Sequence, residues 1–93
     1  MDDDRARLRL IIEGRVQGVW FRASAAEQAQ ASGVTGYARN RPDGAVEIVA
    51  EGSRKKLESL RLWARTGPPL AHVSTITEEW AQFKGDFDCF RVC

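Results

Sequence analysis

Hydrophobic and polar positions alternate near the start of the chain and change to a helical period after residue 20. Three apolar residues share one face of the extended segment 8–13: Leu8, Leu10 and Ile12. This alternation predicts a half-buried β-strand. Three further residues recur at helical spacing within residues 21–32: Phe21, Ala25 and Ala29. Because this stripe is narrow and small, we expect a helix that packs close to a sheet and ends at Gly33.

The middle of the chain predicts a hairpin and a second helix. Two strand-like runs within residues 37–51 surround Pro42-Asp43-Gly44, and an Asp-Gly pair in that position is a strong hairpin signal. Residues 53–66 predict a helix because three apolar residues recur at helical spacing: Leu57, Leu60 and Ala64. Gly67-Pro68-Pro69 ends that helix. Strands are then expected over residues 72–80 and 86–93, with a turn near Lys84-Gly85.

The order of these elements is strand, helix, strand, strand, helix, strand. This βαββαβ order is typical of an α+β protein, the ferredoxin-like split βαβ sandwich, with two helices packed on one face of an antiparallel sheet. The 93 residues suffice for one core, so we expect a single domain over residues 1–93. Residues 1–6 are expected to form a flexible polar tail.

Charge and cysteine content narrow the classes of function. Lys and Arg total 14 against 13 Asp and Glu, and a net charge of +1 gives no global attraction to nucleic acid or an anionic membrane. Any anion site must therefore be local. The acidic N-terminus excludes a secretory signal, and the apolar runs are too short to cross a membrane, so we expect a cytoplasmic protein. Cys89 and Cys93 lie too far apart on a strand to form a disulfide, and free thiols are expected.

Residues 14–22, GRVQGVWFR, join the first strand to the first helix and carry the candidate chemistry. A helix N-terminus exposes unpaired N–H groups and a partial positive charge, which Ser, Thr, Asp or Asn normally caps. No such residue occurs between Gly14 and Ala23. The two glycines, Gly14 and Gly18, allow a run of backbone donors to curl around an anion: Val16, Gln17, Gly18, Val19 and Trp20. Arg22 can reach back over this loop, and its planar guanidinium suits phosphoryl oxygens.

Both this loop and a second stretch also have purely structural interpretations. A G-x-x-x-G turn with a nearby arginine can be only a tight connection, and this one matches neither a P-loop nor a dinucleotide fingerprint. In residues 36–40, GYARN, three residues share one strand face: Gly36, Ala38 and Asn40. The Asn40 amide therefore stands beside small neighbours with space around it. Its structural alternative is a polar residue that ends a strand before a turn.

Together, the loop, Arg22 and Asn40 resemble the acylphosphatase family, and the resemblance covers nearly the whole chain. The matching positions are Gly14, Val16-Gln17-Gly18-Val19, Phe21, Arg22, Gly33-Val34, Gly36-Tyr37, Arg39-Asn40, Asp43-Gly44, Val46-Glu47, Gly67-Pro68-Pro69, Ala71, Val73 and Phe90-Arg91-Val92. These motifs are ordered, spaced and specific. The chain departs from the pattern at Cys93, where a tyrosine or a basic residue is usual.

The resemblance implies an enzyme that hydrolyses carboxyl-phosphate anhydrides to a carboxylate and inorganic phosphate. It implies that Arg22 binds the phosphoryl group, that Asn40 orients the attacking water, and that a loop cradles the phosphoryl group: Arg15, Val16, Gln17, Gly18, Val19 and Trp20. Trp20 is expected at the mouth of this site. A carboxylate leaves without a proton from an enzymic acid, which fits two stretches that contain no histidine, carboxylate or cysteine.

The partners that we expect follow from this chemistry. They are a small-molecule acyl phosphate as substrate, and inorganic phosphate as product and competitive inhibitor. We expect no metal, no cofactor, no nucleic acid and no membrane, and a monomeric protein.

Two other classes of function remain open. An RNA recognition module has the same element order, although Tyr37 is the sole aromatic residue in the first three predicted strands. An accessory domain, such as the acylphosphatase-like segment of a carbamoyl-phosphate-using maturation protein, normally sits at the head of a much longer chain. An acyl phosphate assay beside an RNA-binding titration would discriminate between these classes.

Overall fold

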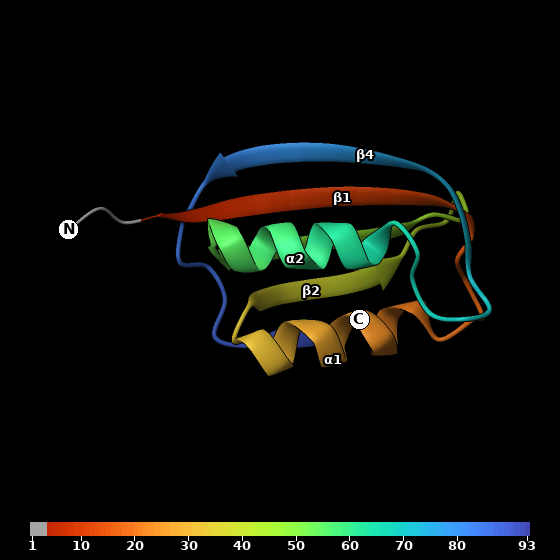
Figure 1. Ribbon diagram of the computed structural model, residues 1–93, viewed down its shortest axis with the longest axis horizontal. Helices are drawn as coiled ribbons and strands as arrows, with labels where there is room; N and C mark the ends of the chain where they lie inside the picture. The colour runs from red at the N-terminus through yellow and green to blue at the C-terminus, as the bar shows by residue number, and fades with distance from the viewer. Residues whose placement is uncertain (1–3) are drawn as a thin grey trace.

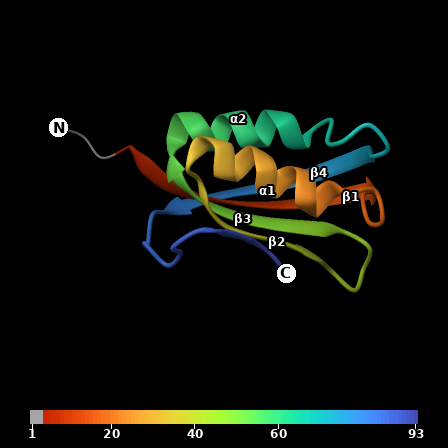
Figure 2. The same cartoon turned by 90° about the horizontal axis from the view of Figure 1, so that it is seen from below.

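Two layers make up the fold: a five-stranded sheet and two helices that cover one of its faces (Figures 1 and 2). The computed structural model describes residues 4–93. In chain order the elements are β1 (Arg5–Arg15), α1 (Phe21–Ser32), β2 (Thr35–Asn40), β3 (Val46–Ser53), α2 (Arg54–Ala64), β4 (His72–Gln82) and β5 (Phe90–Val92). The strand order in the sheet is β4-β1-β3-β2-β5. This arrangement confirms the predicted α+β, ferredoxin-like class.

The last strand makes the sheet mixed. β1 pairs antiparallel with β3 and β4, and β2 pairs antiparallel with β3, as predicted. β5 instead pairs parallel with β2, with Tyr37 opposite Arg91. The expectation of a wholly antiparallel sheet is corrected at this edge. The reason is that residues 83–89 carry the chain to the far edge of the sheet, so β5 does not fold back beside β4.

The first strand is longer than the pattern predicted. It begins at Arg5, which pairs with Ser53 of β3, and Ala6 is buried opposite Gly52. The predicted tail of residues 1–6 is therefore wrong for residues 5 and 6, because the small apolar side chain of Ala6 continues the buried face of the strand. Residues 1–3 of that predicted tail lie outside the described residues.

Both helices begin and end close to their predicted positions. α1 spans residues 21–32 as predicted, and Gly33 ends it by donating its N–H to the carbonyl oxygen of Gln30 at 3.2 Å. Ser53 caps α2, since its hydroxyl accepts a hydrogen bond from the Lys56 N–H at 3.3 Å. α2 ends at Ala64, two residues before the predicted end.

The core lies between the helices and the sheet. Its largest fully buried apolar side chains are those of Leu8, Leu10, Ile12, Val16, Phe21, Val34, Val46, Ile48 and Leu57. The Phe21 ring, at the start of α1, packs against the Trp63 ring of α2 with centroids 5.3 Å apart. This contact fixes the start of α1, and with it the loop that precedes the helix.

The cysteines and the helices bear on two further expectations from the sequence. Cys89 and Cys93 are free and exposed, as predicted. Among residues 4–93, no helix combines the length and the apolar character that crossing a membrane requires.

Candidate active site

The predicted loop, Arg22 and Asn40 meet at one pocket of about 320 Å³. The pocket lies where the start of α1 faces the end of β2 and β5. It is lined by Val16, Gly18, Trp20, Phe21, Arg22, Ala23, Asn40 and Val92. The structure therefore brings together two stretches that the sequence analysis singled out separately.

A β-bulge directs the chain from β1 into this loop. The pairing of β1 with β4 shifts register between Glu13 and Gly14, and Gly14 has φ +127°. A Cβ atom at Gly14 would lie 2.1 Å from the backbone oxygen of His72, so no other residue fits. Gly18 continues the turn with φ +73°. Both glycines thus have the left-handed conformations that the sequence analysis assigned to a curled loop.

Trp20 ends the loop in a strained conformation. Its φ of 68° makes it the one residue other than glycine with a positive φ within residues 4–93. The left-handed region costs about 1–2 kcal/mol for a residue with a Cβ atom. Trp20 occupies the N-cap position of α1, yet its side chain makes no capping hydrogen bond.

The start of α1 is electropositive. The first N–H groups of any α-helix lack partners inside the helix, and they concentrate a partial positive charge. In α1 no side chain caps these groups and no acidic residue lies in the first turn. The Arg22 guanidinium adds a full charge, and no Asp or Glu is among the residues that line the pocket. The site therefore suits an anion.

The Arg22 guanidinium forms few polar contacts with the described residues. Its Nη1 donates to the backbone oxygen of Cys93 at 2.6 Å. Among residues 4–93, no Asp or Glu forms an ion pair with it. A guanidinium has five N–H donors, so most of its hydrogen-bonding capacity is free for a ligand.

Asn40 ends β2 with its amide in the pocket. Its Oδ1 atom is buried and has no hydrogen-bond partner among the described residues. Buried acceptors are nearly always satisfied, so an exception indicates a place where a ligand or water binds. The oxygen can accept a hydrogen bond from a molecule in the pocket.

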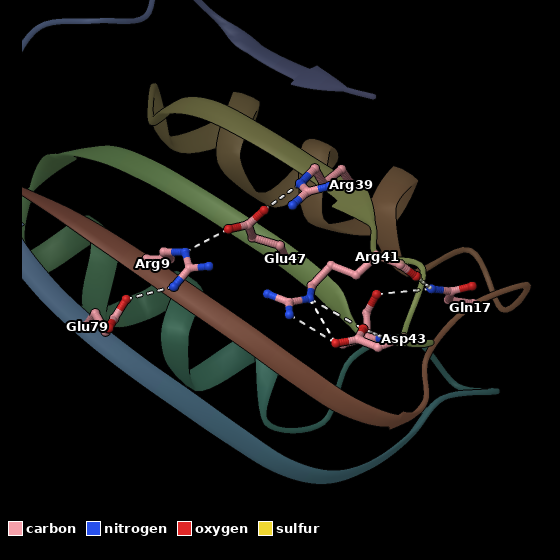
Figure 3. A network of polar contacts seen from close by, with 8 residues as sticks. Arg9, Gln17, Arg39, Arg41, Asp43, Glu47 and Glu79 are labelled. Atoms are coloured by element: carbon pink, nitrogen blue, oxygen red, sulfur yellow. Dashed lines mark hydrogen bonds and ion pairs between the residues drawn. The ribbon is translucent and has the colours of Figure 1, made fainter.

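Gln17 holds the loop against the β2–β3 hairpin. Its Nε2 donates to the backbone oxygens of Arg41 at 2.8 Å and Ala45 at 3.0 Å (Figure 3). From the sequence, Gln17 was expected to contribute only its backbone N–H. The side-chain contacts have no local sequence signal, because both partners are backbone atoms 24 and 28 residues away.

The remaining predicted loop residues face elsewhere. Arg15 is exposed at the end of β1, opposite His72, and Val19 is buried in the core. Neither side chain lines the pocket. Of the six predicted loop residues, the pocket is lined by Val16, Gly18 and Trp20.

The face of the sheet away from the helices carries a second polar cluster that the sequence did not reveal. Glu47 and Glu51 are 3% and 1% exposed. Glu47 accepts hydrogen bonds from Arg9 and Arg39 (Figure 3). Burial raises the pKa of Glu47, but these two hydrogen bonds outweigh burial and hold its pKa below the ordinary value.

Glu51 is held by the segment that follows β4. Its carboxylate accepts the backbone N–H groups of Lys84 at 2.8 Å and of Gly85 and Asp86 at 3.1 Å each. Arg7 adds a bond of 3.3 Å to the same carboxylate. This cluster shares no residue with the pocket, and its buried carboxylates are saturated, so its role is structural. Within residues 4–93, no group of three or more His, Cys, Asp or Glu could hold a metal ion.

Comparisons with known proteins identify a family for this chain. The family model described as acylphosphatase matches residues 8–92. An acylphosphatase of Pelotomaculum thermopropionicum is 48% identical over 95% of this chain and 96% of its own length. The crystal structure of acylphosphatase from Bacillus subtilis matches with a TM-score of 0.91 and 33% identity, over 95% of this chain and 98% of that one. An acylphosphatase structure from Coxiella burnetii matches with a TM-score of 0.90 and 36% identity, over 97% and 94%. The chain therefore belongs to the acylphosphatase family of hydrolases.

Proposed function

We propose that the pocket hydrolyses acyl phosphates, the carboxyl-phosphate anhydrides, to a carboxylate and inorganic phosphate. One observation carries the proposal: Arg22 and the buried, unpartnered Asn40 oxygen line the same pocket at the uncapped start of α1. The cation and the helix terminus suit the phosphoryl group, and the amide suits a water molecule beside it. No step in this scheme requires a metal or a cofactor.

Arg22 and the loop bind the phosphoryl group. The guanidinium exchanges its bond to the Cys93 oxygen for bonds to phosphoryl oxygens, which it can engage two at a time. Backbone N–H groups of residues 15–20 and of the first turn of α1 surround the same group. As charge shifts among the phosphoryl oxygens in the transition state, these donors stabilise it without having to reorganise.

Asn40 orients the nucleophile. Its Oδ1 accepts a hydrogen bond from a water molecule and holds the water in line with the leaving oxygen. The water oxygen forms a bond to phosphorus while the bond from phosphorus to the acyl oxygen breaks. The carboxylate leaves with the bonding electron pair, and the proton lost by the water passes to the phosphate product or to solvent.

The rest of the molecule supports a free small-molecule hydrolase over an RNA-binding module. RNA modules of this fold bind bases on aromatic residues of the sheet face. Here that face carries Glu47, paired with Arg9 and Arg39, and its Tyr37 ring packs against Phe87. We place the enzyme in the cytoplasm, since free exposed thiols fit a reducing compartment. A monomer is the oligomeric state that we expect.

The test is hydrolysis of benzoyl phosphate by the purified protein in excess EDTA. We expect the rate to equal that without EDTA, and inorganic phosphate to inhibit competitively. A rate that returns only when Mg²⁺ is added would overturn the metal-free scheme. Tight RNA binding in a parallel titration, without hydrolysis, would overturn the enzymatic proposal as a whole.

A further inference from the structure

The mouth of the pocket carries exposed apolar side chains. Within residues 4–93, four large hydrophobic residues are exposed: Trp20 (74%), Leu62 (55%), Leu70 (66%) and Val92 (47%). Two of them, Trp20 and Val92, line the same pocket as Arg22 and Asn40. These two lie far apart in the sequence, directly before α1 and at the end of β5. The pocket therefore combines a polar anion site with an apolar rim.

The conformation of Trp20 argues against a purely structural role. The residue has a positive φ, which glycine would adopt without strain, and its side chain does not cap the helix. An indole that is 74% exposed adds little to the core. Neither packing nor capping thus accounts for a tryptophan at this position. Its place beside the anion site gives it a use, which is to contact the part of a ligand that extends beyond the phosphoryl group.

We propose that Trp20 and Val92 bind the acyl group of the substrate and make the enzyme prefer aromatic or large apolar acyl phosphates over acetyl phosphate. This proposal rests on the proposed function, since it takes Arg22 as the anchor of the phosphoryl group. With that group at Arg22, the acyl group projects toward the open mouth of the pocket. An aromatic acyl group there covers apolar surface of the rim that a methyl group leaves in water.

The experiment compares benzoyl phosphate with acetyl phosphate in matched variants. Trp20→Gly removes the ring and fits the positive φ, whereas Trp20→Phe keeps an aromatic ring. Leu62→Ala removes an exposed apolar side chain from α2, outside the pocket, and serves as the control. For each variant, kcat/KM is measured for both substrates, together with the inhibition constant of phosphate. The ratio of the two kcat/KM values, relative to that of the unaltered protein, cancels the intrinsic reactivity of the substrates.

We expect Trp20→Gly to lower this ratio roughly 3- to 10-fold, as suits the loss of one aromatic contact. Hydrolysis of acetyl phosphate should fall less than hydrolysis of benzoyl phosphate, because a methyl group covers little of the indole ring. Trp20→Phe and Leu62→Ala should keep the ratio. An unchanged ratio in Trp20→Gly, or an equal loss for both substrates, would overturn the rim proposal and leave the proposed function intact. If the unaltered protein hydrolyses neither substrate, both proposals fail.

A separate observation concerns the coupling of the loop to Asn40. Both N–H bonds of the Gln17 amide are directed at backbone oxygens of the β2–β3 hairpin, those of Arg41 and Ala45. Arg41 follows Asn40 directly in the chain, so the clamp joins the backbone that binds the phosphoryl group to the strand end that carries Asn40. We infer that Gln17 is a positioning residue, which fixes the distance between the phosphoryl group and the attacking water.

Gln17→Glu tests this inference because it keeps the size of the side chain and removes both donors. At pH 7 the carboxylate faces two carbonyl oxygens, and we expect kcat to fall roughly 10-fold or more. Its negative charge should also weaken inhibition by phosphate, whereas the uncharged Gln17→Met should weaken that inhibition less. On acidification the new carboxyl group takes up a proton and regains one donor, so kcat relative to the unaltered protein should rise. Gln17→Met lacks any donor and should show no such recovery.

The charges and the control for this experiment are defined by the structure. The neighbouring charged groups on the hairpin are Arg41 and Asp43, which pair with each other at 3.0 Å. Hydrogen bonds from the Ala45 N–H and Arg41 lower the pKa of Asp43, so it stays ionised over the range from pH 7 to pH 5. Gln30→Glu is the control, since Gln30 also donates to a backbone oxygen, that of Phe90 at 3.2 Å. A kcat of Gln17→Glu within 2-fold of the unaltered protein, or a loss that does not depend on pH, would overturn the inference.

Discussion

Polar groups in the pocket and on the charged face of the sheet differ in how many hydrogen-bond partners the protein gives them. On the charged face, Glu51 accepts three backbone N–H groups and an arginine, and Glu47 accepts two arginines. In the pocket, the Asn40 oxygen accepts nothing from the described residues, and Arg22 holds one backbone oxygen. The carboxylates of the charged face have a full set of hydrogen-bond partners, whereas Asn40 and Arg22 can still form hydrogen bonds to a ligand.

This difference separates stability from function. A buried polar group with a full set of partners strengthens the fold, while one without a partner costs free energy until a ligand or water satisfies it. The strained φ of Trp20 also costs free energy, and like the Asn40 oxygen it lies in the pocket. Substitutions in the pocket should therefore change activity more than stability, and substitutions on the charged face should do the reverse.

The largest effect is expected for turnover in the pocket. Arg22→Ala and Asn40→Ala should each lower kcat by a factor on the order of 10² to 10³, the usual cost of losing one oriented transition-state group. The two variants should differ in phosphate binding. Arg22→Ala should weaken inhibition by phosphate, because the guanidinium binds the phosphoryl group in ground and transition states alike. Asn40→Ala should keep it, because the amide touches only the water.

The measurement pairs kcat with the inhibition constant of phosphate, with folding confirmed by circular dichroism. Arg22→Lys provides the control, since a point charge does not replace the planar guanidinium and should not restore turnover. Normal turnover in Asn40→Ala, or unaltered phosphate binding in Arg22→Ala, would show that the roles are wrongly assigned.

The next largest effect is expected for stability, where the charged face should be more sensitive to substitution than the pocket. Glu51→Ala should lower the free energy of unfolding by about 3 kcal/mol, because it leaves Arg7 and three backbone N–H groups without their carboxylate. Asn40→Ala removes an acceptor that has no partner and should change it by less than about 1 kcal/mol. Urea denaturation of both variants measures the difference. If Asn40→Ala proves the more destabilising of the two, the contrast between the regions is wrong.

A smaller effect is expected in the pH dependence of stability. The pKa of Glu47 in the folded protein lies below its ordinary value of 4.5, since the bonds from Arg9 and Arg39 outweigh burial. The stability contributed by Glu47 is therefore present above about pH 4.5 and is lost as pH falls through the lower, folded-state pKa. From pH 6 to pH 3, the unaltered protein should lose about 1 kcal/mol more than Glu47→Gln. Parallel losses in thermal or urea unfolding would contradict this assignment.

The smallest effect is expected for the thiols. Replacing Cys89 and Cys93 together by Ser should leave kcat within a few-fold, because both side chains are exposed and Arg22 contacts only the backbone oxygen of Cys93. An assay with and without a thiol-blocking reagent on the unaltered protein provides an independent check. A large loss of activity in the folded double variant would reveal a role for a thiol in the reaction.

Local patterns were sufficient for most of the fold. The stripe of Phe21, Ala25 and Ala29 with Gly33 behind it defined α1 to the residue. The Asp43-Gly44 pair located the β2–β3 hairpin. The same patterns placed Arg22 in the first turn of α1 and Asn40 at the end of β2, because the period of each element was clear. The family resemblance implied that the two act at one site, and the structure places both on the lining of one pocket.

What the sequence did not reveal depends on contacts across long separations. Glu47 and Glu51 alternate with apolar residues and should face solvent by that pattern alone. They are buried because Arg9 and Arg39 flank Glu47, and because the segment after β4 crosses the sheet over Glu51. The parallel pairing of β5 and the Gln17 clamp have the same origin. None of these contacts has a local signature.

The edge position of β5 has a consequence for how the protein folds. Val92 reaches the pocket only when this three-residue strand has joined β2, and the Arg22–Cys93 contact spans 71 positions of the chain. Closing so long a loop is entropically costly, and few contacts hold a strand this short once it arrives. Folds dominated by such non-local pairings form slowly. A refolding chain can thus complete the four-stranded antiparallel part and most of its core while β5, which carries the buried Phe90 and one wall of the pocket, is still missing. The recovery of enzymatic activity would then lag behind the packing of Trp63 and Trp80 against the core.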